Sequence, residues 1–145
     1  MNKYFATYAA TFVVMVALDV IWLGVVAKSF YQDGIGHLMA EKPIVSVAVA
    51  FYVMYAIGLV FFAVVANEAS AGYGKTVLYG ALFGFFAYAT YDLTNLATLK
   101  NWPVGLALLD MAWGTVVSAV SAVAGKAALD QIGRASCRER VCLAV

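Results

Sequence analysis

Charged side chains are scarce in this chain of 145 residues. Only 12% of the residues are charged and 65% are hydrophobic, whereas soluble domains carry about 25% charged residues. Residues 1–130 also contain no arginine and no cysteine. Without a basic stripe we expect no binding to nucleic acid, and without cysteine this part has no disulfide, thiolate metal site or cysteine nucleophile. The composition indicates an integral membrane protein.

Four apolar stretches are long enough to cross a hydrocarbon core, which takes about 20 helical residues. They are residues 4–27, 44–66, 77–98 and 104–124. The first stretch is too long for a cleaved signal peptide, and we interpret it as a retained span. We therefore predict an all-α fold, an integral membrane bundle of four transmembrane helices within residues 1–130. The loop lysines divide evenly between the two sides, so the positive-inside rule gives no orientation.

Residues 131–145 differ in character from the rest of the chain. They hold all three arginines and both cysteines. Residues 132–141 are encoded in order by ATC GGA AGA GCG TCG TGT AGG GAA AGA GTG, which resembles a sequencing adapter. We therefore predict a non-native tail at 131–145 and expect the native C-terminus to be missing. The alternative is a natural basic tail that binds lipid headgroups.

Three aspartates lie inside three different apolar stretches. Asp19, Asp92 and Asp110 are costly there without a partner or a function, and no lysine, arginine or histidine lies within any stretch. With a rise of 1.5 Å per residue and alternating helix directions, all three lie roughly 9 to 13 Å from one membrane face. The second stretch brings Tyr52 and Tyr55 to a similar or slightly greater depth. We expect their hydroxyl groups to complete a polar layer.

Each aspartate also lies on a stripe of polar and small residues at helical spacing. Gly80 and Gly84 in the third stretch, and Gly114 and Ser118 in the fourth, predict close helix contacts, because small residues let backbones approach in lipid.

A short motif occurs twice, in the first and the last stretch. Residues 18–22 and 109–113 both read Leu-Asp-x-x-Trp, which places an indole beside each carboxyl on one helix face. The repeat is either a remnant of an internal duplication or a pair of indoles that donate hydrogen bonds or anchor near an interface.

Several of these motifs together resemble a known family. Residues 91–103 read YDLTNLATLKNWP, residues 18–24 read LDVIWLG, residues 30–38 contain FY and GHL, and residues 110–114 read DMAWG. This set resembles the bacterial membrane family called domain of unknown function 2177, over nearly all of residues 1–125. The resemblance implies a four-span fold and a bacterial inner-membrane location, and it brings no assigned activity.

Three buried carboxyls at one level favour a site for a proton or a cation, because burial and mutual repulsion both disfavour ionisation. Oxygen ligands suit Na⁺, Mg²⁺ or Ca²⁺, and aromatic faces suit an organic cation; no metal site is firmly predicted. We predict a multi-pass membrane protein that is a proton- or cation-coupled carrier or binding protein for a small molecule. The predicted site residues are Asp19, Asp92, Asn95 and Asp110, lined by Trp22, Trp113, Tyr88 and Tyr91.

Two other functions remain open. The aspartates could only hold the bundle together by hydrogen bonds, or they could serve an enzyme acting on a lipid or other apolar substrate. The sequence lacks the nucleophile motifs, HExxH signature and glycine-rich phosphate loops of hydrolases and kinases. We expect no cofactor. The expected partners are the lipid bilayer, a small cation or apolar ligand, and a second copy of the chain in a homodimer.

Overall fold

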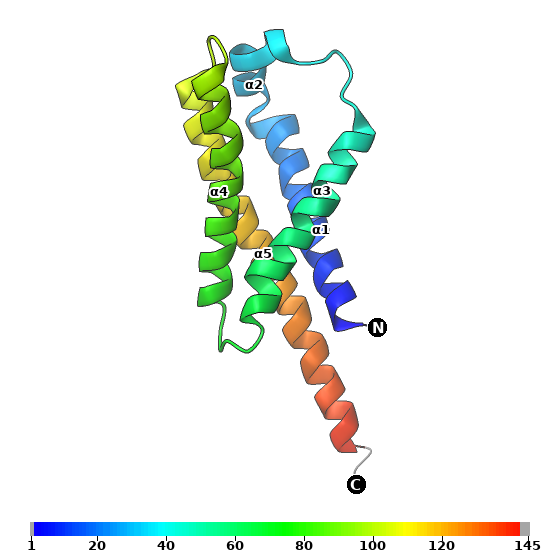
Figure 1. Ribbon diagram of the computed structural model, residues 1–145. Coiled ribbons are helices and arrows are strands. Elements are labelled where there is room, and N and C mark those ends of the chain that lie inside the picture. The colour runs from blue at the N-terminus through cyan, green and yellow to red at the C-terminus, as the bar shows by residue number, and fades with distance from the viewer. Residues whose placement is uncertain (1, 143–145) are drawn as a thin grey trace.

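The computed structural model describes residues 2–142, with side chains described as far as Ala135, and this part of the chain is helical except for short loops (Figure 1). No strand occurs among these residues, so the predicted all-α fold is confirmed. The elements in chain order are α1 (Lys3–Ile21), η1 (Trp22–Val26), α2 (Lys28–Ile35), η2 (Gly36–Leu38), α3 (Val45–Leu59), η3 (Val60–Val64), η4 (Val65–Asn67), α4 (Gly74–Thr98) and α5 (Val104–Cys142).

Three helical segments are long and apolar enough to cross a membrane: Lys3–Val26, Val45–Asn67 and Val104–Ala135. They coincide with the first, second and fourth predicted spans. Helix α4 covers the third predicted span, but its tyrosine, threonine, glycine and aspartate residues make it less apolar. The membrane character of the fold is therefore confirmed, and a crossing by α4 stays a prediction.

Helix α5 is longer than the sequence pattern indicated. The apolar stretch ends at residue 124, yet α5 continues to Cys142 without a break. No proline follows Pro103 in the sequence, and the segment after Gly125 is rich in alanine, a strong helix former. The helix therefore extends into the predicted non-native tail, whose origin stays a prediction. Residues 143–145 of that tail lie outside the described residues.

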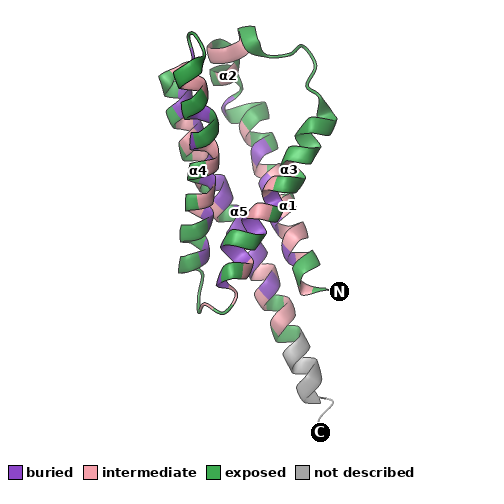
Figure 2. Cartoon of the chain, viewed as in Figure 1, coloured by how far each residue is buried: buried purple, intermediate pink, exposed green. Residues whose placement is uncertain are grey.

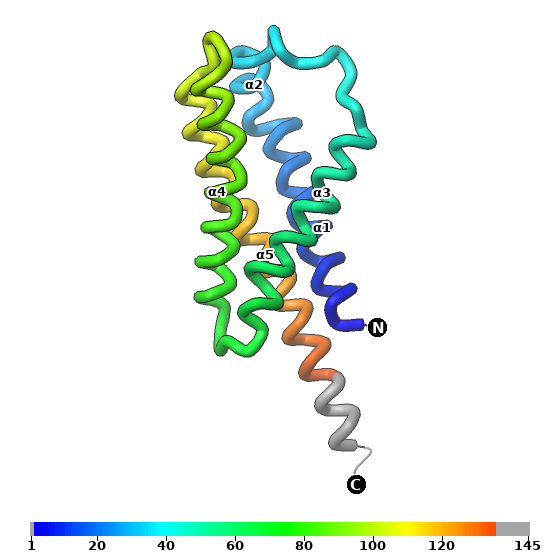
Figure 3. Tube along the Cα trace, viewed as in Figure 1, coloured from blue at the N-terminus to red at the C-terminus, as the bar shows by residue number. Residues whose placement is uncertain are grey.

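Helices α4 and α5 lie side by side, joined by a short loop at the end of the molecule that also carries α2 (Figure 3). A Cβ atom on Gly84 would overlap the carbonyl oxygen of Gly114, and one on Gly80 would lie 3.1 Å from the Cα of Ala119. A Cβ on Gly114 would overlap the ring of Tyr88. The predicted small-residue contact is therefore confirmed, and it is tight enough to require glycine.

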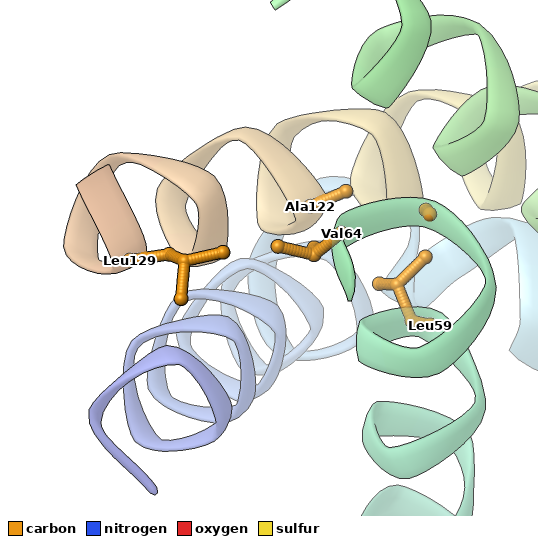
Figure 4. Close-up of a cluster of buried hydrophobic side chains, with 5 residues drawn as sticks. Leu59, Val64, Ala122 and Leu129 are labelled. Atoms are coloured by element: carbon orange, nitrogen blue, oxygen red, sulfur yellow. The ribbon is translucent and has the colours of Figure 1, made fainter. Parts of the chain in front are cut away.

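The apolar core lies at the end of the bundle away from α2, where α3 and η3 cross α5. Leu59 and Val64 pack there against Ala122 and Leu129 of α5, together with the buried Ala63 (Figure 4). A second buried cluster, Met15, Ala56 and Val117, joins α1, α3 and α5. Helix α5 is thus the element against which the other long helices pack.

Towards the α2 end, α3 leans away from α4 (Figure 1). Residues 45–51 of α3 are all exposed (Figure 2), and α4 packs instead against η3, near the other end of the bundle. The two helices therefore form the sides of a V whose broad end lies beside α2.

A polar cluster ties the beginning of α1 and the turn after η4 to α5, at the end of the bundle away from α2. Lys3 forms an ion pair with Glu68, and the hydroxyl of Tyr4 donates to Glu68 Oε2 at 3.2 Å. The buried Lys126 donates to the carbonyl of Glu68 at 3.3 Å and to Asp130 Oδ1 at 3.1 Å. The hydrogen bond from Lys3 holds the pKa of Glu68 below its usual range.

We expect Gly84→Ala to destabilise the protein by about 1 to 3 kcal/mol, because the added methyl group overpacks the α4–α5 contact. Gly105→Ala is the matched control, since a Cβ there meets nothing within 4 Å and alanine favours a helix. Unfolding of both variants in detergent, followed by circular dichroism, measures the difference. Equal stability of the two variants would contradict the tight contact.

We also expect Glu68→Gln to lose stability only where Glu68 is ionised. Because the folded state lowers the pKa of Glu68, its contribution is fully present above the ordinary pKa of a glutamate. It disappears as the pH falls through the lowered value. Thermal unfolding of wild type and variant across a pH series should show melting curves that differ at neutral pH and converge in acid. A difference that persists in acid would show that the ion pair is not its source.

Candidate functional site

A cavity of about 470 Å³ lies among α1, α3, α4 and α5, on the side where α3 and α4 diverge. Every long helix contributes to its lining. The lining residues are Asp19, Trp22 and Leu23 from α1 and η1, Tyr31 from α2, Phe51, Tyr52 and Tyr55 from α3, Ala87, Tyr88 and Tyr91 from α4, and Asp110 and Trp113 from α5.

Asp19 is the most fully satisfied of the carboxyl groups. Its side chain is 5% exposed, and Trp113 Nε1 donates to its Oδ1 at 2.7 Å. The hydroxyl of Tyr52 donates to its Oδ2 at 3.0 Å. The expectation that α3 supplies a hydroxyl to this layer is therefore correct for Tyr52. One carboxyl group connects three helices.

Asp110 is 6% exposed and accepts a hydrogen bond from the hydroxyl of Tyr31. Tyr31 comes from α2, which folds back over the end of the bundle (Figure 1). Tyr31 is not among the site residues predicted from the sequence. The one available signal was the Phe-Tyr pair at 30–31 in the family motif, because periodicity within the apolar stretches says nothing about a loop helix.

The two tryptophans of the repeated motif stack on each other. The rings of Trp22 and Trp113 are 4.2 Å apart and inclined by 2°. Trp113 donates to the aspartate of the other copy of the motif, Asp19, whereas Nε1 of Trp22 is buried without a partner in the described part of the chain. The repeat therefore forms one joint aromatic unit with a single unused N–H donor.

Tyr88 and Tyr91 complete the aromatic wall from α4. Tyr88 packs over Gly114 and its ring meets that of Tyr55 edge-on at 6.3 Å. The hydroxyl of Tyr55 shares a hydrogen bond of 2.7 Å with Ser118 Oγ. Tyr91 lies nearer the surface, against Trp102.

Asp92 and Asn95, the remaining predicted site residues, do not line the cavity. Asp92 is 0% exposed, and among the described residues neither of its oxygen atoms has a hydrogen-bond partner. Since Tyr88 lies against Gly114, the next turns of the antiparallel pair place Asp92 near the level of Asp110. The structure thus brings six of the eight predicted residues to one cavity and places Asp92 within the adjoining helix contact.

Within the part of the chain that the structure describes, no group of three histidine, cysteine, aspartate or glutamate side chains is arranged to hold a metal ion. The carboxyl oxygens of Asp19 instead accept indole and phenol hydrogen bonds. Fixed aromatic walls around buried acceptors suit an organic ligand.

Residues 4–127 match a family described as "Predicted membrane protein (DUF2177)". The chain belongs to this family. The match includes every residue of the cavity and supports the membrane location, while the description names no activity. No curated protein and no solved structure shows significant similarity to the chain.

We expect Trp113→Phe to destabilise the protein by about 0.6 to 1.7 kcal/mol, from the average to the largest value found for hydrogen bonds between membrane helices. The substitution removes the donor to Asp19 and keeps an aromatic ring against Trp22. Tyr79→Phe, at an exposed tyrosine away from the cavity, is the control. Equilibrium unfolding in mixed micelles gives the comparison, and a Trp113 variant as stable as the control would show that this bond contributes nothing.

Proposed function

We propose that the protein binds a small organic cation in the cavity and exchanges it for protons. The observation that supports this most strongly is the pairing of two buried carboxyl groups, Asp19 and Asp110, with a lining that contains no lysine, arginine or histidine. Ionised carboxylates in an apolar membrane interior need compensation. Protons supply it in the empty cavity, and a bound cation supplies it in the loaded one.

The aromatic walls favour an organic cation over a hydrated metal ion. A cation near a ring face is attracted by the ring quadrupole, most strongly by tryptophan, and Trp22, Trp113 and Tyr88 all present rings to the cavity. Trp22 Nε1 is in addition buried without a hydrogen-bond partner among the described residues. These features are more than cross-linking of the bundle requires.

Asp92 has a separate role in this proposal. A buried carboxyl without a partner is tolerated far better when neutral than when ionised. Asp92 therefore keeps a proton in the resting protein and, with Asn95 one turn away, provides a place for protons released near Asp110. Uptake or export of the cation against a proton gradient is the function that follows.

The lipid-exposed rim of the cavity gives support to one alternative. Phe51 and Tyr91 line the cavity and are 48% and 52% exposed, so an apolar substrate could reach the carboxyl groups. In that case Asp110 and Tyr31 would act as a general acid–base pair. Turnover of a lipid in place of reversible cation binding would identify this enzyme.

Binding of tetraphenylphosphonium to the purified protein in nanodiscs tests the proposal. Because its charge is fixed, affinity should rise with pH as the carboxyl groups lose protons, and binding should release protons into a weakly buffered solution. Asp110→Asn should weaken binding by at least about ten-fold, the 1.4 kcal/mol expected from loss of one charged contact. Calorimetry in buffers of different ionisation enthalpy measures both quantities.

Asp33→Asn, at an exposed aspartate of α2 outside the cavity lining, is the control and should bind as wild type does. Thermal unfolding of each variant shows whether it has kept its fold. Binding that is independent of pH would contradict proton exchange. Absence of binding by a stable wild type to this probe and to tetraethylammonium would leave the aspartates a structural role.

A further inference from the structure

We infer that the ligand reaches the cavity from the lipid phase between α3 and α4, and that it is a single-chain amphiphile with a cationic head and a hydrocarbon chain. The head group rests on the proposed function, because Asp19 and Asp110 hold it. The route and the chain are the additional inference, and they follow from which sides of the cavity are closed.

The α2 end of the cavity is closed by a side chain. Tyr31 of α2 reaches across to donate a hydrogen bond to Asp110, and its ring is part of the lining. A ligand that arrived from water at this end would have to break that bond and displace α2. The shortest path from the aqueous phase is therefore blocked.

The opposite end is closed by the packed interior of the bundle. Tyr55 shares a hydrogen bond with Ser118 and meets Phe83 edge-on at 5.1 Å. Beyond these rings lies the apolar cluster around Leu59 and Val64 (Figure 4). No path for a polar molecule leads through this part.

The wall formed by α1 and α5 is closed as well. The stacked rings of Trp22 and Trp113 fill the contact between the two helices, and the hydrogen bond from Trp113 to Asp19 holds them together. A molecule could pass here only by separating the rings.

The hydrogen bond from Tyr52 to Asp19 crosses between α3 and α1. The open side lies between α3 and α4, which diverge towards α2 (Figure 1). Its rim carries one half-exposed aromatic residue from each helix, Phe51 from α3 and Tyr91 from α4. Asp19 and Asp110, the charged residues of the lining, are both buried deeper in the cavity. Phe51 lies within a segment long and apolar enough to span the membrane, and an exposed side chain of such a segment meets lipid. With α4 as the predicted third span, this side opens to the hydrocarbon region.

The chemistry of the lining changes along this route in one direction. Carboxyl groups lie at the inner end, aromatic rings line the passage, and apolar groups form the rim. An amphiphile matches each of these three zones if its cationic head lies between the aspartates and its chain extends over Phe51. A compact cation such as tetramethylammonium would leave the rim unused.

The first test compares tetramethylammonium with butyl- and decyltrimethylammonium, which share one head group. Each buried methylene adds about 0.8 kcal/mol, roughly four-fold in affinity, so saturable binding to the protein in nanodiscs should tighten from butyl to decyl by well over ten-fold. Ala87→Trp fills the passage from α4 and should remove most of this gain. Phe86→Trp, at an exposed neighbour outside the lining, should behave as wild type and controls for partitioning into the bilayer.

The second test asks directly whether lipid chains reach the cavity. In Trp102→Phe the remaining tryptophans are Trp22 and Trp113, both in the lining. Their fluorescence should be quenched by phosphatidylcholine with brominated chains and should resist acrylamide in the water phase. Decyltrimethylammonium should protect against the brominated lipid.

The outcomes separate this inference from the proposed function. Suppose that tetramethylammonium binds, but that the decyl chain gives no gain in affinity or a gain that persists in Ala87→Trp. The inference of an amphiphilic ligand is then wrong, and the proposed cation site stands. Strong quenching by acrylamide without quenching by brominated lipid would overturn the lateral route. If none of the three cations binds to a folded protein, the cation site and this inference both fall.

Discussion

Burying a carboxyl group among apolar helices costs free energy unless neighbouring groups bond to it or neutralise its charge. The half of the bundle next to α2 is arranged around that requirement. Asp19 accepts hydrogen bonds from a tryptophan of α5 and a tyrosine of α3. Asp110 accepts a hydrogen bond from Tyr31, and this bond holds α2 across the end of the bundle. The cavity lies beside these two carboxyl groups and their donors, and further aromatic residues of α3 and α4 complete its lining.

The other half depends on a different interaction. Lipid offers helices no hydrophobic reason to associate, so close backbone approach and dispersion must hold them. The contact of Gly80 and Gly84 with α5 supplies this approach and fixes where Tyr88 stands. Helix α4 packs along α5, whereas the α3–η3 segment meets α4 only through η3, at the end away from α2. The V between α3 and α4 is therefore a result of packing, and the cavity lies where the two helices diverge.

Much of the site was accessible from the sequence because membrane length and helical period are strong constraints. Asp19 and Asp110 fall at one predicted depth, and the repeated Leu-Asp-x-x-Trp motif contains Trp22 and Trp113; all four line the cavity. The motif did not predict that Trp113 donates a hydrogen bond to the aspartate of the other copy. Spacing along one helix does not specify which side chains meet across a contact between two helices. Tyr31 was missed because a short helix outside the apolar stretches has no depth that can be counted. Asp92 satisfied the same depth and face criteria as the others, yet a small rotation about α4 is enough to turn a side chain from the cavity into the α4–α5 contact.

Composition and apolar periodicity alone determined that this is an all-α membrane protein, where its long helices lie, and that the aspartates are its unusual residues, because the cost of polar groups in lipid acts on each segment separately. The tertiary structure alone decided which donors bond to Asp19 and Asp110, that Tyr31 of α2 joins the cavity, and that α3 and α4 diverge beside it. Those features depend on crossing angles and on backbone separations of a few ångströms between distant segments, and no single segment of the sequence specifies them.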